Sequence, residues 1–161
     1  MQSFTPDEID HSIITALQKD GRLSNVQLAQ MVNLSESACL RRVKMLERSG
    51  VIDRYVMLVN QAASGKPDNV FIQITLDRQQ QEDFQHFENA IRAIPEVMEC
   101  YLMTGTSDYL VRVVVRDTSD YERLHTKYLT RLPGVVRVQS SFALRTVTKK
   151  TQIPMDASHA L

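Results

Sequence analysis

The sequence is poor in cysteine and has no excess of charge of either sign. Cys39 and Cys100 are the only cysteines among 161 residues, and they lie far apart without a paired spacing. This usage favours a reducing compartment and argues against a zinc site. The histidines are scattered, and none has a ligand-type neighbour at metal spacing, so we expect no bound metal. They are His11, His86, His125 and His159.

Lysine and arginine together number 19, as do aspartate and glutamate, which gives a formal net charge of zero. A neutral chain is not a general binder of polyanions, so any affinity for nucleic acid must come from local clustering of basic residues. No segment approaches the roughly 18 consecutive apolar residues that span a membrane. The first residues, MQSFTPDEIDHS, lack the pattern of a signal peptide. We therefore expect a cytoplasmic protein that does not associate with membranes.

Three short helices are predicted before Gly50. In Thr5-Pro6-Asp7-Glu8, Thr5 is a candidate N-cap and Glu8 completes a capping box. Ser24 and Gln27 form a second capping box, and Ser35 is a candidate cap for a third helix that runs to Gly50. A short strand is expected to follow, near Ile52 to Val59. The tight turn before the third helix makes the group a helix-turn-helix, whose last helix is the candidate for the major groove.

The third helix turns polar and basic side chains away from its apolar side. Arginine can pair with a guanine edge, and serine can contact a base or a phosphate. Lys44 and Arg48 lie further along the helix and suit phosphates, as do the free N–H groups at the helix start. The candidate DNA-binding residues are Ser35, Ser37, Ala38, Arg41, Arg42, Lys44 and Arg48. A basic helix face can also be plain solvated surface or a protein contact, and these alternatives stay open at this point.

The segment from Gln61 to Asn69 is small and polar and predicts a linker between a domain at 1–60 and another at 70–161. Beyond it, hydrophobic residues alternate in four segments and recur at helical spacing in two. The predicted order is strand 70–76, a helix that stops at Pro95, strands 97–104 and 109–116, a helix that starts at Ser119, and strand 135–144. This βαββαβ order is typical of a ferredoxin-like sheet with both helices on one face, so the chain as a whole is expected to be α+β.

The face of that sheet without helices needs a cover. Apolar residues occur in both alternation phases of the predicted second strand, with Met98, Cys100 and Leu102 in one phase and Val97, Tyr101 and Met103 in the other. A sheet that is apolar on both faces calls for a partner. We therefore expect self-association through this domain; the alternative is that the polar tail after Lys149 folds over the sheet.

Three segments resemble the leucine-responsive/asparagine regulator family (Lrp/AsnC): Gly21 to Tyr55, Pro95 to Val113 and Leu129 to Val147. Together with their order, they extend the resemblance over nearly the whole chain, and the second half is similar to members that govern branched-chain amino-acid metabolism. The resemblance implies a winged helix-turn-helix, a hinge strand and a ligand-sensing domain. It also implies dimers, often assembled into tetramers or octamers, that bind double-stranded DNA at half-sites.

The resemblance further implies an amino-acid effector, bound between dimers at the turn that joins the second and third strands. The Gly-x-x-Asp turn of the family matches Gly105 to Asp108. Asp108 is suited to the effector's ammonium group, and the N–H groups of Thr104 to Thr106 are suited to its carboxylate. The remaining candidate effector residues are Met103 and Leu110, which flank the turn, and Ser140 and Ser141, which match effector-linked positions of the family.

Leucine, another branched-chain amino acid or methionine is the implied effector, and no cofactor is expected. The family often has an acidic residue at the position of Thr106, so this departure bears on the identity of the effector. Ordinary turn chemistry is the alternative reading of the same residues, because glycine supplies positive φ and aspartate bonds to its own backbone.

Two other function classes remain. A few enzymes of haem biosynthesis share this architecture, but the sequence offers no activated nucleophile, carboxylate pair or metal cluster, so we expect no catalytic residues and no enzyme. An architectural DNA-binding protein without an effector would keep the same third helix and the same oligomer. Only the turn from Gly105 to Asp108 separates this alternative from an effector-responsive regulator of transcription.

Overall fold

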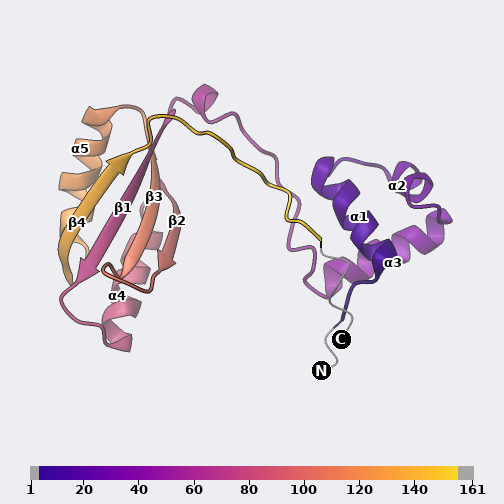
Figure 1. The fold of residues 1–161 in the computed structure, drawn as a ribbon, viewed down its shortest axis with the longest axis horizontal. Coiled ribbons are helices and arrows are strands. Elements are labelled where there is room, and N and C mark those ends of the chain that lie inside the picture. The colour runs from indigo at the N-terminus through magenta and orange to yellow at the C-terminus, as the bar shows by residue number, and fades with distance from the viewer. Residues whose placement is uncertain (1–3, 156–161) are drawn as a thin grey trace. The chain divides into compact units, whose positions relative to one another are not determined.

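The structure, a computed structural model, describes residues 4–155. The chain divides into two compact units (Figure 1). The first comprises the chain up to Leu58 together with the segment from Thr148 onward, and the second comprises Val59–Val147. The C-terminal segment therefore belongs with the first unit, whereas the sequence analysis placed it in the second domain. In its described part, residues 148–155, this tail therefore does not cover the open face of the sheet, which was the alternative to self-association.

The first unit contains the predicted three helices, α1 (Glu8–Lys19), α2 (Asn25–Met31) and α3 (Glu36–Arg48). The predicted cap of α1 is wrong. Asp7 is the N-cap, because its carboxylate accepts the N–H of Asp10 at 2.8 Å while the Asp10 carboxylate accepts the N–H of Asp7 at 3.1 Å. Carboxylates at both ends of this reciprocal pair outcompete Thr5, which lies two residues before the cap.

The other two helix starts are confirmed. Ser24 and Gln27 form the predicted capping box of α2, and the Ser35 hydroxyl accepts the N–H of Ala38 at the start of α3. The apolar sides of the three helices pack together in one core, in which Cys39 and Leu46 of α3 are fully buried. The buried members of this core are Ile13, Ile14, Ala16, Leu28, Ala29, Cys39 and Leu46.

The strand predicted near Ile52 to Val59 is wrong for this chain taken by itself. The segment is extended, but within residues 4–155 it has no strand partner. A strand exists only where a neighbour supplies the ladder of hydrogen bonds, so side-chain pattern alone cannot create one. Consecutive apolar side chains are exposed as a result, up to 83% for Met57.

The second unit confirms the βαββαβ order and the α+β class. Its elements are β1 (Asp68–Leu76), α4 (Gln81–Arg92), β2 (Val97–Leu102), β3 (Tyr109–Val115), α5 (Thr118–Lys127) and β4 (Val135–Phe142), with short 3₁₀ turns at Ala62–Ser64 and Leu129–Arg131. The strands form one antiparallel sheet in the order β2-β3-β1-β4. Both helices cover the same face of this sheet (Figure 1). The last three strands end one or two residues earlier than predicted.

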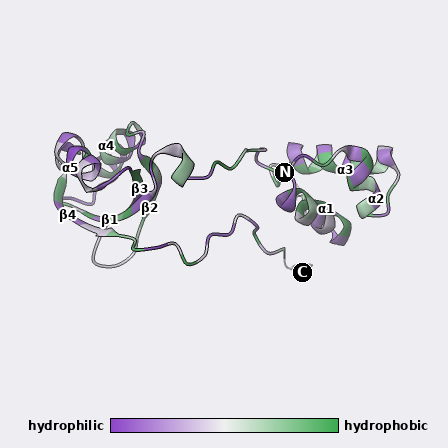
Figure 2. Cartoon of the chain, turned by 90° about the horizontal axis from the view of Figure 1, so that it is seen from above, coloured by the Kyte–Doolittle hydropathy of each residue, from purple (hydrophilic) through white to green (hydrophobic). Residues whose placement is uncertain are grey.

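The covered face of the sheet holds the core of the second unit. Val70, Ile72 and Ile74 of β1 point into it, since every second residue of this strand is buried. Phe87 and Ile91 of α4 pack against them from the helix layer. By contrast, α5 is coloured largely hydrophilic in Figure 2, because its residues are mostly polar, and most of its side chains are exposed to solvent.

The open face of the sheet is mixed rather than wholly apolar. Phe71 is exposed at its centre, and Tyr101 is exposed on β2. Between them, the guanidinium of Arg112 bonds to the Glu99 carboxylate at 2.6 Å and to the Asn69 side chain at 2.8 Å. The expectation of an apolar second face therefore holds only in part.

None of the helices in residues 4–155 combines the length and the apolar composition that a membrane span requires.

Candidate nucleic-acid interface and ligand turn

The solvent face of α3 brings together most of the predicted DNA-binding residues. Ser35, Ser37, Arg41, Lys44 and Arg48 are exposed, and Ala38 is half-buried. Four of these side chains line one shallow surface cavity with their apolar neighbours, and these lining residues are Phe4, Ser37, Leu40, Arg41, Lys44, Met45, Arg48 and Ser49. The helix therefore presents a continuous strip of cations and hydroxyls, which is the chemistry that phosphates and guanine edges require.

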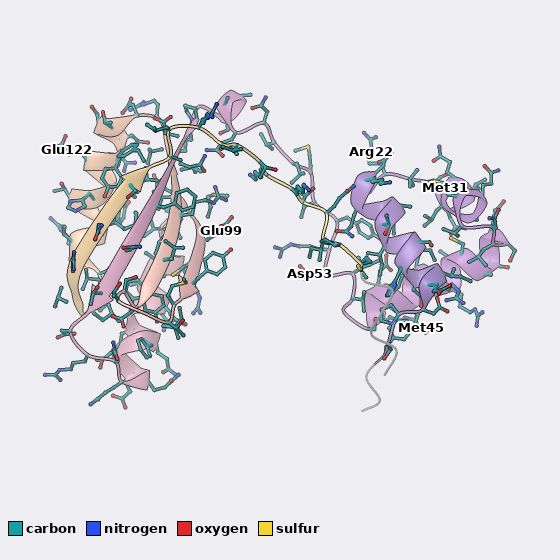
Figure 3. The ribbon with its side chains drawn as sticks, in the orientation of Figure 1. Arg22, Met31, Met45, Asp53, Glu99 and Glu122 are labelled. Carbon is teal, nitrogen blue, oxygen red and sulfur yellow. The ribbon has the colours of Figure 1, made fainter. Side chains whose placement is uncertain are left out.

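Two apolar side chains on this strip were missed by the sequence analysis. Leu40 is 42% exposed and Met45 is 39% exposed, and Met45 is labelled on the helix in Figure 3. The helical period that places Cys39, Val43 and Leu46 inside leaves Leu40 and Met45 outside, so the signal was present. An exposed aliphatic group beside an arginine suits the methyl group of a thymine.

Arg42 does not join this strip. Its Nη1 bonds to the carboxylates of Asp7 and Asp10 at 2.8 Å each, and its side chain is only 22% exposed. The hydrogen bond to Asp10, followed by that to Asp7, raises the pKa of Arg42. The N–H of Asp10 and then the guanidinium lower the pKa of Asp7. Arg42 thus holds α3 against the start of α1, and the ion pairs engage the guanidinium that was predicted to contact DNA.

The turn between β2 and β3 is built around Gly105 and Asp108. Gly105 has a φ of +127°, which favours glycine, while a Cβ there would meet no atom within 4 Å. Asp108 is only 7% exposed. Its backbone accepts the N–H of Met103 at 2.8 Å and donates to the carbonyl of Ile74 at 2.9 Å. The turn is therefore fastened to the end of β1 as well as to its own two strands.

The Asp108 carboxylate strengthens this attachment. One oxygen accepts the N–H of Leu76 at 2.7 Å, and the other accepts a hydrogen bond from the Gln79 side chain at 2.7 Å. Both oxygens are thus used within the chain, although a carboxylate has further lone pairs. The Leu76 bond is buried, whereas Gln79 belongs to an exposed loop. Gln79 was missed, because no spacing in the sequence relates it to Asp108.

The structure groups only some of the predicted effector residues. Met103, Thr104, Gly105, Thr106 and Asp108 share the turn, and Leu110 follows it on β3.

Ser140 and Ser141 lie apart from that turn. The hydroxyl of Ser140 bonds to that of Tyr121 on the helix side of the sheet. Ser141 pairs in register with Phe71, three residues along β1 from Ile74, the partner of Tyr109. That offset is about 10 Å along the strand. Within one chain, the two serines therefore do not complete a site with the turn.

Residues 4–155 offer neither a metal-ligating cluster nor a thiol with a lowered pKa. No group of three or more His, Cys, Asp or Glu side chains there could hold a metal, and His159 lies outside the described residues. Burial raises the pKa of Cys100 to about 11 and also raises that of Tyr109. A thiol with so high a pKa stays protonated and is a poor nucleophile.

Comparison with known proteins matches both units. Residues 6–53 match the family model "Winged helix-turn-helix DNA-binding", and residues 69–153 match "Lrp/AsnC ligand binding domain". The leucine-responsive regulatory protein of Escherichia coli K12 is 40% identical over 147 residues, which are 91% of this chain and 90% of that protein. An uncharacterized HTH-type transcriptional regulator of Sinorhizobium fredii is 51% identical over 116 residues, which are 72% of this chain and 91% of the relative.

Solved structures of transcriptional regulators superpose on nearly the whole chain. The transcriptional regulator NMB0573 of Neisseria meningitidis, in complex with L-Met, superposes with a TM-score of 0.88 at 34% identity, covering 93% of this chain and 97% of that one. An AsnC family regulator of Agrobacterium tumefaciens gives a TM-score of 0.89 at 33% identity, covering 92% and 97%. The matched family models and the named relatives are those of DNA-binding transcriptional regulators, not of enzymes. The chain belongs to the Lrp/AsnC family.

Proposed function

We propose that the protein recognises specific operator DNA through α3 and that a small apolar amino acid controls its DNA affinity or its oligomeric state. The observation that carries the DNA part is the state of the cations on α3. Arg41, Lys44 and Arg48 are exposed and, within residues 4–155, take part in no ion pair. Arg42, on the same helix, is neutralised by two carboxylates. Free cations on a single face are what binding to phosphates requires.

Roles on the DNA follow from position along α3. Ser35, Ser37 and Ala38 lie in the first turn, where a recognition helix meets base edges and a phosphate. Arg41 lies one turn further and is the side chain suited to a guanine. Lys44 and Arg48 follow on the same side and bind the backbone, which positions the protein without reading sequence.

The effector is leucine, another branched-chain amino acid or methionine. Its carboxylate binds the N–H groups of Thr104 to Thr106, and its ammonium binds Asp108 by displacing the exposed Gln79 amide. Met103 and Leu110 contact its apolar side chain. Support comes from the similarity to a regulator solved with L-Met and to relatives named leucine-responsive regulatory proteins. Because Ser140 and Ser141 lie apart from the turn in one chain, they act from a neighbouring copy.

Assembly follows from the surface of the second unit. The open sheet face, with Phe71 and Tyr101 exposed on it, is the surface through which two copies pair into a dimer, and dimers join into tetramers or octamers. Two helix-turn-helix units in one dimer then bind the two halves of an operator. We place this assembly in the cytoplasm, with access to both DNA and free amino acids.

One observation favours a second candidate, an architectural DNA-binding protein without an effector. Both oxygens of Asp108 are already hydrogen-bonded within the chain, so the turn has a complete structural role with no ligand. This candidate keeps the same contacts of α3 with DNA and the same oligomer.

Calorimetric titration with the twenty amino acids, with light scattering on the same samples, separates the two candidates. Binding of a few apolar amino acids with a change in oligomer size supports the effector-responsive regulator. Binding of none at millimolar concentration leaves the DNA-binding proposal intact and selects the architectural protein. DNA binding itself is tested separately, by selecting sites from a random DNA pool and measuring the salt dependence of affinity.

A further inference from the structure

The C-terminal segment makes a specific contact with α1 of the first unit. The side-chain amide of Gln18 donates to the carbonyl of Ile153 at 3.0 Å, and the N–H of Ile153 donates back to the Gln18 carbonyl oxygen at 2.6 Å. One side chain therefore satisfies both backbone groups of a residue 135 positions away. Because the two bonds are reciprocal, they select Ile153 over its neighbours and set the register of the segment on the helix.

An apolar anchor follows two residues later. Met155 is half-buried and packs against the hydrophobic core of the three helices. It also closes one side of a surface cavity between α1 and α2, whose other walls include Met31, labelled in Figure 3. The residues that line this cavity are Glu8, His11, Ser12, Thr15, Ala16, Lys19, Met31, Val32 and Met155. This surface belongs to α1 and α2 and leaves out the α3 side chains proposed to read DNA.

The docked segment follows the last strand of the sheet along the chain. β4 ends at Phe142, the N–H of Ala143 still bonds to the carbonyl of Asn69 at 3.0 Å, and the segment from Thr148 onward belongs with the first unit. The first unit is thus attached to the second unit by two separate chain segments. One is the linker that precedes β1, and the other leaves β4.

We infer that the α1–α2 surface is a docking site for this chain's own C-terminal segment, residues 148–155, which acts as a latch on the DNA-binding unit. The latch closes a loop from α1 through the sheet and back to α1. Closing that loop tethers the first unit at two points and so restricts its freedom to move relative to the sheet. It also couples the stability of α1 to the C-terminal segment that follows β4. The inference needs no effector and is independent of the proposed ligand turn.

Hydrogen exchange of the full-length protein tests whether the latch holds. Gln18→Ala, and separately a chain ending at Lys149, should accelerate amide exchange in α1 by about fivefold, while β1 and β3 keep their protection. Gln30→Ala is the matched control, because Gln30 is exposed on α2 and its side chain makes no hydrogen bond within the described residues. Unchanged exchange of α1 in the shortened chain overturns the inference.

Cross-linking tests whose segment occupies the site. Lys19→Cys with Ile153→Cys, in a Cys100→Ser background, keeps Gln18 intact and places two exposed thiols beside the contact, while Cys39 stays buried. Light and isotope-labelled chains are unfolded, mixed, refolded together and treated with a short bis-maleimide. Cross-linked peptides of a single isotope support docking within one chain. Peptides that combine the two isotopes show a segment from another copy, and that result, like the absence of any cross-link, overturns the inference.

Discussion

The guanidinium of Arg42 on α3 lies 2.8 Å from the carboxylate of Asp10 on α1, and only 3% of Asp10 is exposed. This pair joins the candidate recognition helix to the start of the chain's first helix. It places two neighbouring arginines in different environments: Arg41 is exposed to solvent, whereas Arg42 is ion-paired to α1.

Arg42→Ala should destabilise the first unit by about 2 kcal/mol, since it leaves the buried Asp10 carboxylate without its cation. Arg41→Ala is the matched control and should leave the unfolding free energy within about 0.5 kcal/mol while weakening DNA binding. Denaturant unfolding and fluorescence anisotropy on a selected DNA site measure the two effects. A stable Arg42→Ala protein that has lost DNA affinity would show that Arg42 contacts DNA after all.

Acid should loosen the same contact. The pKa of Asp7 is lowered in the folded chain, first by the N–H of Asp10 and then by Arg42, so its contribution to stability is complete above the unfolded value of about 3.9. That contribution is lost as the pH falls through the lower, folded value. Asp7→Asn keeps a capping side chain but removes the titration. Unfolding between pH 5 and 2.5 should therefore show a shallower loss of stability for Asp7→Asn, and identical profiles would rule out the assignment.

The cations of α3 should differ in what they do on DNA. Lys44→Ala should weaken binding almost equally for all sequences and lower the slope of log affinity against log salt by about one unit. Arg41→Ala should cost about 1–3 kcal/mol on the selected site and relax the preference at one base pair. Competition with selected and scrambled DNA at several salt concentrations distinguishes them. Equal effects of both substitutions on both DNAs would contradict the division of roles.

The Asp108–Gln79 hydrogen bond should compete with the effector. Gln79→Ala frees one carboxylate oxygen without disturbing the buried Leu76 bond, so amino-acid binding should tighten by up to about tenfold, the equivalent of one net hydrogen bond. Gln80→Ala is the matched control, because Gln80 is exposed in the same loop and its side chain makes no capping bond. Calorimetry with L-methionine and L-leucine measures the change.

Asp108→Ala should destabilise the second unit by about 1–3 kcal/mol even without any amino acid, because the N–H of Leu76 then loses its buried acceptor. Thermal unfolding of the ligand-free protein shows this directly. A variant with unchanged stability that no longer binds the amino acid would assign Asp108 to the ligand alone. Loss of both properties assigns it to the turn and to the ligand.

Short-range patterns in the sequence predicted most of the helices and strands and the sides that they bury. The Ser24 capping box, the buried stripe of α3 and the alternation of β1 each depend on residues a few positions apart, and the structure has them where they were expected. The first cap was misassigned, because two carboxylates three residues apart compete better than the threonine before them. That comparison of caps was available in the sequence.

Long-range pairs could not be read from the sequence. Gln18 meets Ile153 across 135 positions, and Gln79 meets Asp108 across 29. No periodicity links such positions, since each pair depends on how loops approach after the core has formed. The apolar residues from Tyr55 to Val59 show the opposite failure: they have the composition of a strand, but a strand requires a partner that these residues do not have within the described chain.

Because Cys39 is buried in the core of the three helices, its reactivity reports whether the first unit is folded. This thiol is fully enclosed by the three helices, and burial raises its pKa, so an alkylating reagent reaches it only when the unit opens. The Cys39 thiol is thereby shielded from mild oxidants as long as the unit is folded. The rate at which Cys39 is alkylated, measured by mass spectrometry, therefore reports how often the first unit opens, without an engineered probe.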